Sequence, residues 1–257
     1  IRNKFESLEL LIKDKFDIFL ISESKLDSSF PNAQFYLPGY RIFRKDRNEY
    51  GGGLIFYINQ DIPCKQINNF HFRSLGEVLI LEITLGKQKL LIFGIYKPPS
   101  VNNELFLKDM YDAIAFYNTS YDNFILLGDF NIERGNENLI DFCDCYNFEQ
   151  LLKESTCFKG INPSSIDHII TNIPTRFMKS KALETGISDH HKMVFTIFRS
   201  TFAKGKSKSI FYRDYKNLNP QMLHEEISNK LINIKENSYE NFSNTLESTI
   251  EKLAPLK

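Results

Sequence analysis

The sequence predicts a layered α/β domain over residues 1–198, followed by a short helical extension. Three observations support this fold class: an amphipathic helix at the start, a succession of short apolar runs bounded by Gly, Pro and polar residues, and helical patterns between the later runs. Helices and strands that alternate along one chain are typical of sheets covered by helices. A chain of 257 residues with 23 Phe and 12 Tyr has enough large apolar side chains for such a core.

The first half of the chain contains one predicted helix and five predicted strands. Apolar residues recur at helical spacing in residues 3–15, and a short apolar run then ends in Ser22-Glu23-Ser24, as expected of a buried strand with a polar end. Pro38-Gly39 and Gly51-Gly52-Gly53 precede two further apolar segments. We expect strands at 17–21, 40–44, 54–58, 77–85 and 88–96.

The second half of the domain alternates between helices and strands. Residues 104–117 have a helical pattern, and the buried run 124–127 leads directly into Gly128-Asp129-Phe130-Asn131. A second helix is expected at 136–152, and the last strands at 165–170 and 193–197.

Near residue 199 the composition changes. Six basic residues against one acid make 199–216 a basic linker, and the apolar spacing in 217–257 predicts a helical C-terminal extension too short to form a core alone. Overall, 32 basic and 32 acidic residues balance, and residues 1–198 carry a small acidic excess. This balance excludes attraction of a polyanion by the whole domain, so any such binding has to be local and assisted by metal ions.

Cellular context follows from what the sequence does not contain. No apolar run approaches the roughly 18 residues of a membrane span, and the first residues lack the apolar core of a secretion signal. The four cysteines have neither C-x-x-C nor zinc-ligand spacing. We therefore expect reduced thiols in an intracellular protein, nuclear or cytoplasmic, that is neither secreted nor bound to membranes.

Polar residues stand where the apolar strands end, and these are the candidates for chemistry. Carboxylates gathered at one sheet rim repel unless a cation joins them, and their oxygens suit Mg²⁺ or Mn²⁺. A histidine beside an aspartate supplies proton transfer near neutral pH. Such a set fits phosphodiester hydrolysis better than acyl transfer, for which a G-x-S-x-G turn is missing. The residues concerned are Glu23, Asp129, Asn131, Asp167, Asp189 and His190.

Each candidate also has a structural interpretation. Glu23 alone fits an exposed strand end, and Asp129 fits a turn or a helix cap. Asp167 is harder to explain in this way, because an unpaired carboxylate in an apolar strand is costly. His190 fits a surface position, and we expect His191 beside it to be a surface residue without a catalytic role.

Taken together, the motifs resemble those of the endonuclease/exonuclease/phosphatase superfamily. The order Ser22-Glu23-Ser24, Gly128-Asp129-Phe130-Asn131, Ser165-Ile166-Asp167-His168 and Ser188-Asp189-His190 carries the resemblance. Gly51-Gly52-Gly53 and Tyr96-Lys97-Pro98-Pro99 make the chain most similar to the endonuclease domain of LINE-type (non-LTR) retrotransposons, which is abasic-endonuclease-like. The resemblance covers residues 1–198.

The resemblance implies a four-layered α/β sandwich of two packed mixed β-sheets flanked by helices. Members of the family begin with a strand that carries a site Asn, before the helix at 3–15. This chain starts at that helix, so we expect the first strand, and with it one site residue, to be missing.

The resemblance also assigns roles to the candidate residues. Glu23 is expected to bind the divalent ion, and Asp189 to support the site or a second metal position. Tyr96 and Asn131 are expected to hold the scissile phosphate, and Asp129 to align or deprotonate the attacking water. His190, oriented by Asp167, is expected to contact the phosphate or share the role of base.

Basic residues near the expected site are candidates for contacts to the DNA backbone. Arg44 and Arg47 lie near a strand and a loop that suit this role, and the alternative is a solvated strand edge protected by basic side chains. Lys97 is held in extended backbone by the prolines after it and is expected to contact a phosphate.

The function implied is a Mg²⁺-dependent endonuclease that nicks DNA and leaves a 3′-hydroxyl, fused to or associated with a reverse transcriptase in the intact element. Two alternatives stay open. One is another phosphoesterase of the same superfamily, and the other is a degenerate, catalytically impaired remnant of such a domain.

Overall fold

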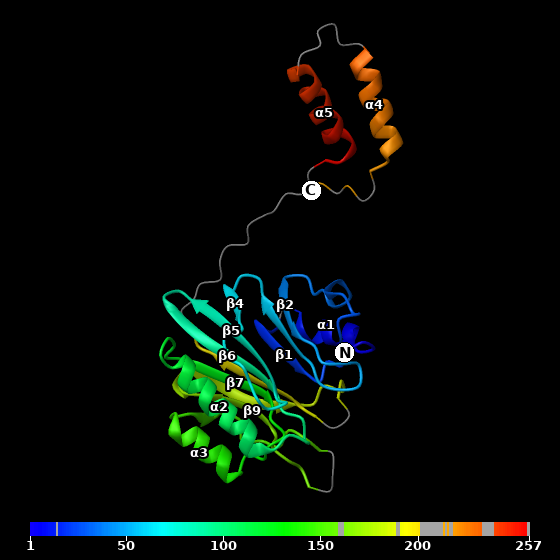
Figure 1. Ribbon diagram of the computed structural model, residues 1–257. Coiled ribbons are helices and arrows are strands. Elements are labelled where there is room, and N and C mark those ends of the chain that lie inside the picture. Colours follow the sequence, from blue (N-terminus) through cyan, green and yellow to red (C-terminus); the bar gives the residue numbers. More distant parts are fainter. Residues whose placement is uncertain are drawn as a thin grey trace. The chain divides into compact units, whose positions relative to one another are not determined.

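The computed structural model describes residues 1–13, 15–158, 162–188, 191–200, 213, 215, 218–232 and 239–255 (Figure 1). The chain divides into two compact units, Ile1–Gly205 and Lys206–Lys257. The second unit contains a pair of helices, α4 (Pro220–Ile232) and α5 (Tyr239–Leu253). Most of the predicted basic linker, including residues 201–212, lies outside the described residues. None of the helices in the described part of the chain is long and apolar enough to cross a membrane.

The first unit contains two larger sheets and a two-stranded hairpin. A three-stranded antiparallel sheet has the order β1-β3-β2, and a six-stranded sheet has the order β4-β5-β6-β7-β9-β8, with β6 and β7 parallel. The hairpin pairs β10 with β11. The strands are β1 (Ile18–Ser22), β2 (Tyr40–Lys45), β3 (Leu54–Asn59), β4 (Cys64–Ile67), β5 (Glu77–Leu85), β6 (Gln88–Tyr96), β7 (Phe124–Asp129), β8 (Glu149–Gln150), β9 (Asp167–Thr171), β10 (Phe177–Leu183) and β11 (Met193–Phe198).

Three clusters of buried side chains define four layers. One cluster packs helix α1 (Phe5–Ile12) and the short helix η1 (Asn32–Phe35) against the outer face of the three-stranded sheet. A second lies between the two larger sheets, and a third packs helices α2 (Asn103–Tyr117) and α3 (Glu137–Cys145) on the far face of the six-stranded sheet (Figure 1). The predicted four-layered α/β sandwich is confirmed.

The structure differs from the sequence prediction in several elements. The predicted helix at 136–152 ends at Cys145, because Asn147 adopts a left-handed φ of 53° and the chain then forms the short strand β8 beside β9. Strands β4 and β10 were not predicted, since their many polar and basic residues hide the pattern of a strand. The short helix η2 (Pro174–Arg176) precedes β10.

Strand β1 lies at an edge of its sheet and borders a large cavity. Within the described residues β1 pairs with β3 only. A cavity of about 1340 Å³ extends along β1 to the β10–β11 hairpin, and Glu23, Asp129, Asp167 and His191 are among the residues that line it. The candidate site therefore opens into this cavity.

Candidate active site

Three candidate residues lie in one row at the rim of the six-stranded sheet, at the ends of three neighbouring strands. Tyr96, the last residue of β6, lies opposite Asp129, the last residue of β7, which in turn lies opposite Asp167 at the start of β9. Residues directly opposite one another project from the same face of a sheet. The register of three strands thus brings together side chains that are far apart in the sequence.

The Gly128-Asp129-Phe130-Asn131 motif begins at a close backbone contact between β7 and β6. Gly128 has a φ of +136°, and a Cβ at this position would lie 2.0 Å from the carbonyl oxygen of Ile95. Only glycine therefore allows β7 to approach β6 here. Phe130 is fully buried and packs edge-on against Phe106, which fixes the chain between the two polar residues of the motif.

Asn131 closes the turn after Asp129. Its backbone N–H donates to Asp129 Oδ1 over 3.0 Å, and its side-chain amide donates to the Lys97 carbonyl over 2.9 Å. Its φ of 45° is left-handed, a conformation that asparagine tolerates better than most residues. These bonds hold Asn131 beside the end of β6.

Asp129 is a buried acid with a raised pKa. It is 7% exposed. Burial, followed by the neighbouring charge of Asp167, raises its pKa to about 7, while the bond from the Asn131 N–H opposes the rise. A carboxyl group that titrates near neutral pH is suited to accept a proton from water.

Glu23, which follows a strand of the three-stranded sheet, contacts Tyr96 of the six-stranded sheet. Glu23 follows β1 with a left-handed φ of 53°, and its Oε1 accepts a hydrogen bond from the Tyr96 hydroxyl. Burial and this bond raise the pKa of Tyr96, so the phenol stays protonated and remains a donor. The predicted metal ligand and the predicted phosphate contact are therefore adjacent.

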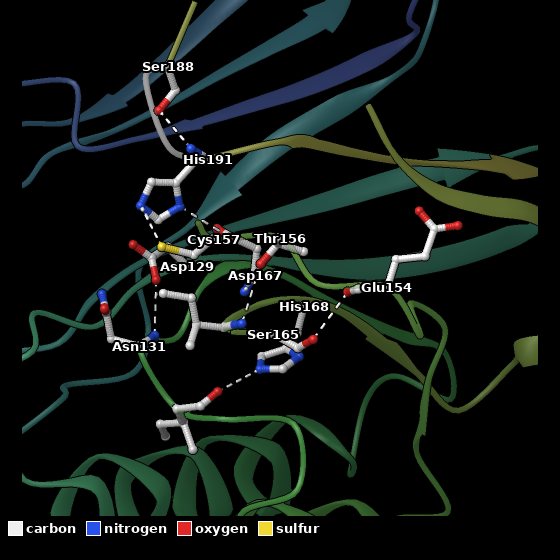
Figure 2. Close-up of polar contacts among 12 residues, drawn as sticks. Asp129, Asn131, Glu154, Thr156, Cys157, Ser165, Asp167, His168, Ser188 and His191 are labelled. Atoms are coloured by element: carbon white, nitrogen blue, oxygen red, sulfur yellow. Dashed lines mark hydrogen bonds and ion pairs between the residues drawn. The ribbon is translucent and has the colours of Figure 1, made fainter. Parts of the chain in front are cut away.

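Among the residues that the structure describes, the histidine whose ring lies against Asp167 is His191. Its Nδ1 is 3.4 Å from Asp167 Oδ2, and its Nε2 is 3.6 Å from the Cys157 thiol (Figure 2). The Asp167 contact raises the pKa of His191, and burial opposes the rise. The expectation that His191 is a surface residue apart from the site was wrong. His190 and Asp189 lie outside the described residues, so their predicted roles stay predictions.

Two of the three basic side chains predicted to bind DNA, those of Arg44 and Lys97, form hydrogen bonds within the protein. The Arg44 guanidinium contacts Asp46 and Asn32 and the backbone carbonyls of residues 27 and 30. Lys97 is 1% exposed because its ammonium donates to the Pro98 and Val101 carbonyls. The structure thus gives both side chains a role within the protein, and their predicted contacts with DNA stay predictions. Arg47 has a half-exposed side chain that also contacts Glu77 over 3.3 Å.

Sequence reasoning missed two residues at the site, Glu77 and Cys157. Glu77 lies opposite Tyr96 and extends the row by one strand. The hairpin between β5 and β6 turns at residues 86–87, and pairing the strands outward from that turn places Glu77 beside Tyr96, so the signal was present. Cys157 lies in a loop, and we find no sequence signal that would bring it to His191.

Oxygen ligands for a hard divalent ion are present at the site. Glu23, Asp129 and Asp167 all line the cavity, and the acidity of Asp129 reflects the charges of the other two. The described residues contain no group of three or more His, Cys, Asp or Glu side chains placed to hold a metal. Mg²⁺ often takes one or two protein carboxylates and fills its other positions with water and substrate phosphate, so binding of Mg²⁺ here stays a prediction.

Comparison with protein families agrees with this architecture. Residues 5–190 match the Endonuclease/Exonuclease/phosphatase family, and the chain belongs to this family. The match spans both sheets and every strand that contributes to the row. The sequence has no significant match among curated proteins.

Solved structures with the same fold include several nucleic-acid enzymes. The endonuclease domain of TRAS1, a telomere-specific non-LTR retrotransposon, has a TM-score of 0.59 at 15% identity, over 77% of this chain and 93% of that one. The 3′ phosphatase NExo from Neisseria, bound to a product DNA hairpin, has 0.56 at 17%, over 76% and 94%. An AP endonuclease from Archaeoglobus fulgidus has 0.55 at 15%, over 77% and 95%. These likenesses concern the fold.

Proposed function

We propose that the first unit is a divalent-metal-dependent endonuclease that hydrolyses a phosphodiester bond of DNA and leaves a 3′-hydroxyl. The observation that carries the proposal is the row of Tyr96, Asp129 and Asp167, with Glu23 bound to Tyr96 and His191 beside Asp167. A buried acid that titrates near neutral pH beside a histidine and a phenolic donor suits attack of water on a phosphate better than recognition alone.

The side chains of the site have two roles, which are proton transfer and stabilisation of the charge on the phosphate. Asp129 receives the proton of the attacking water, because its pKa of about 7 lies near the operating pH. His191 supplies positive charge to the phosphate oxygens, since its contact with Asp167 favours the protonated ring. Tyr96 donates a hydrogen bond to the phosphate in place of its bond to Glu23.

Mg²⁺ is the proposed cofactor, with Glu23 as its protein ligand and Asp189 as a further candidate. The ion neutralises charge on the phosphate when bound. Mn²⁺ has similar ligand preferences and is expected to substitute. DNA is the proposed substrate because the TRAS1 and NExo domains, which share the fold, are described as an endonuclease domain and as an enzyme bound to a DNA hairpin.

A nicking assay on supercoiled plasmid tests the proposal. We expect conversion to open circles in Mg²⁺, none in EDTA, and extension of the nicked strand by a DNA polymerase, which needs a 3′-hydroxyl. Nicks that need end-repair before extension would contradict the proposed product. Release of phosphate from a 3′-phosphorylated oligonucleotide without nicking would assign the domain to another activity of the family.

In the intact element we expect this domain to act with a reverse transcriptase that extends the 3′-hydroxyl. Synthesis of complementary DNA from the nick by the longer protein would test this partnership. The domain alone is expected to nick without synthesis.

A further inference from the structure

Glu77, the first residue of β5, is a buried acid in the same row as the candidate site. It lies opposite Tyr96 in the antiparallel pairing of β5 with β6, so the two side chains project from the same face. Glu77 is 7% exposed, and the proposed chemistry makes no use of it. A carboxylate buried at this place needs partners that compensate for the loss of water.

The partners of Glu77 come from the loop that leads into β3. The Gly53 N–H donates to Oε2 over 2.5 Å, and the Arg47 guanidinium donates to Oε1 over 3.3 Å. The side chain of Arg47 is 44% exposed, whereas that of Glu77 is 9% exposed. The bond to Gly53 is therefore the better protected of the two.

The same glycines hold the backbone next to Glu23. The Ser24 N–H donates to the Gly53 carbonyl over 3.1 Å, and the Lys25 N–H donates to the Gly52 carbonyl over 2.9 Å. Glu23 and Lys25 have left-handed φ values of 53° and 54°, which non-glycine residues keep only where the surroundings hold them. Hydrogen bonds thus run without a break from Glu77 through the glycines to the backbone that carries Glu23.

The space beside both glycines is filled by neighbouring side chains. A Cβ on Gly52 would lie 2.2 Å from Glu77 Oε1, and a Cβ on Gly53 would lie 2.2 Å from Ser24 Oγ. Both glycines also have positive φ values, +75° and +90°. Glycine at both positions lets the loop touch Glu77 on one side and Ser24 on the other.

We propose that Glu77 is a positioning residue for Glu23. Its carboxylate anchors the Gly52-Gly53 backbone, and that backbone fixes the conformation that directs the Glu23 carboxylate to Tyr96. The inference rests on the proposed function, in which Glu23 binds the divalent ion. Glu77 acts on the reaction only indirectly, through the glycines.

A matched pair of variants separates this role from general stability. Glu82 is also on β5, is 5% exposed, and contacts Tyr121, Lys65 and Lys89, but it lies about 16 Å along the strand and on the opposite face. Glu77→Ala and Glu82→Ala each remove a buried, paired carboxylate. Amide hydrogen exchange at Ser24 and Lys25 in metal-free protein, and Mg²⁺ affinity by calorimetry, are measured for both.

We expect Glu77→Ala to speed exchange at Ser24 and Lys25 about tenfold or more and to weaken Mg²⁺ binding about tenfold, the usual effect of losing a residue that orients a ligand. Glu82→Ala should change neither. Glu77→Gln keeps an oxygen that accepts the Gly53 N–H, so it should restore both quantities toward the wild-type values.

Unchanged exchange at Ser24 and Lys25 in Glu77→Ala, or equal acceleration in Glu82→Ala, would overturn the positioning role. So would faster exchange with unchanged Mg²⁺ affinity. Wild-type protein that neither binds Mg²⁺ nor nicks DNA would instead overturn the proposed function. The proposed effect of Glu77 on metal binding would then fall with it. The exchange measurement reads the backbone alone, so the two failures are distinguishable.

Discussion

His191 Nδ1 lies 3.4 Å from Asp167 Oδ2, which places an imidazole ring beside the row of carboxylates at the rim of the six-stranded sheet. The contact raises the pKa of His191 and thereby favours a positive charge close to Asp129. The site then combines one acid that titrates near neutral pH with one cation.

Removal of the His191 ring should slow DNA nicking on the order of 100-fold, a typical loss for an acid–base or charge-stabilising group. The reason is that His191→Ala removes the cation that Asp167 orients. Single-turnover nicking rates at saturating Mg²⁺ measure the effect. His190→Ala is the matched comparison, because it removes the neighbouring ring. Full activity in His191→Ala together with a large loss in His190→Ala would assign this role to His190, as the sequence predicts.

Glu23→Gln should abolish metal-dependent nicking while the protein keeps its fold. The substitution preserves size and can still accept a hydrogen bond from Tyr96, but it removes the charge that attracts Mg²⁺. Calorimetric Mg²⁺ titration and thermal unfolding report the two properties separately. Glu247→Gln in α5 serves as a control for loss of one carboxylate. Wild-type Mg²⁺ affinity in the Glu23 variant would remove Glu23 from the metal site.

Stability of the metal-free protein should depend on the ionisation of Asp129. Its pKa is raised from 3.8 to about 7 by burial and by Asp167. Between these values the folded state holds a proton that the unfolded state has lost, so the free energy of unfolding falls as pH rises and levels off above about 7. Asp129→Asn should lack this part of the fall. Chemical unfolding at several pH values in EDTA measures the difference, and identical pH dependence in both proteins would show that Asp129 titrates normally.

Gly128→Ala should destabilise the first unit by roughly 3 kcal/mol, because an added Cβ meets the Ile95 carbonyl and the backbone is left-handed. Gly135→Ala provides the control, since a Cβ there meets nothing within 4 Å. Denaturant unfolding compares the two variants with the wild type. Equal stability of the two variants would mean that β6 and β7 separate more easily than the close contact implies.

Much of the fold was predictable because its buried strands are uninterrupted apolar runs. Strands Phe124–Asp129 and Gln88–Tyr96 each contain such a run, and they form the centre of the six-stranded sheet. Strand Phe177–Leu183 alternates half-buried and exposed residues and carries two lysines, so its pattern is weak. The end of α3 was missed because the left-handed turn at Asn147 depends on how the chain returns to β9.

The site was predictable where side chains follow directly from strand ends, as with Glu23 and Asp129. It was not predictable for His191, because its contact with Asp167 depends on how the chain enters β11. Burial of Lys97 could not be predicted either, because it depends on the turn that brings the Pro98 and Val101 carbonyls to one ammonium group. Such contacts follow from tertiary geometry rather than from spacing along the chain.

The nicking rate of Asp129→Asn, compared with that of the wild-type protein, measures the contribution of Asp129 to catalysis. Supercoiled plasmid in excess Mg²⁺ is the substrate, and Glu82→Gln, with a substituted acid on the opposite face of the sheet, is the control. If Asp129 accepts the proton of the attacking water, the Asp129 variant should lose 100-fold or more in rate, a typical contribution of general base catalysis, while the control keeps the wild-type rate. Equal nicking by wild type and Asp129→Asn, or no metal-dependent nicking by the wild type, would contradict the account.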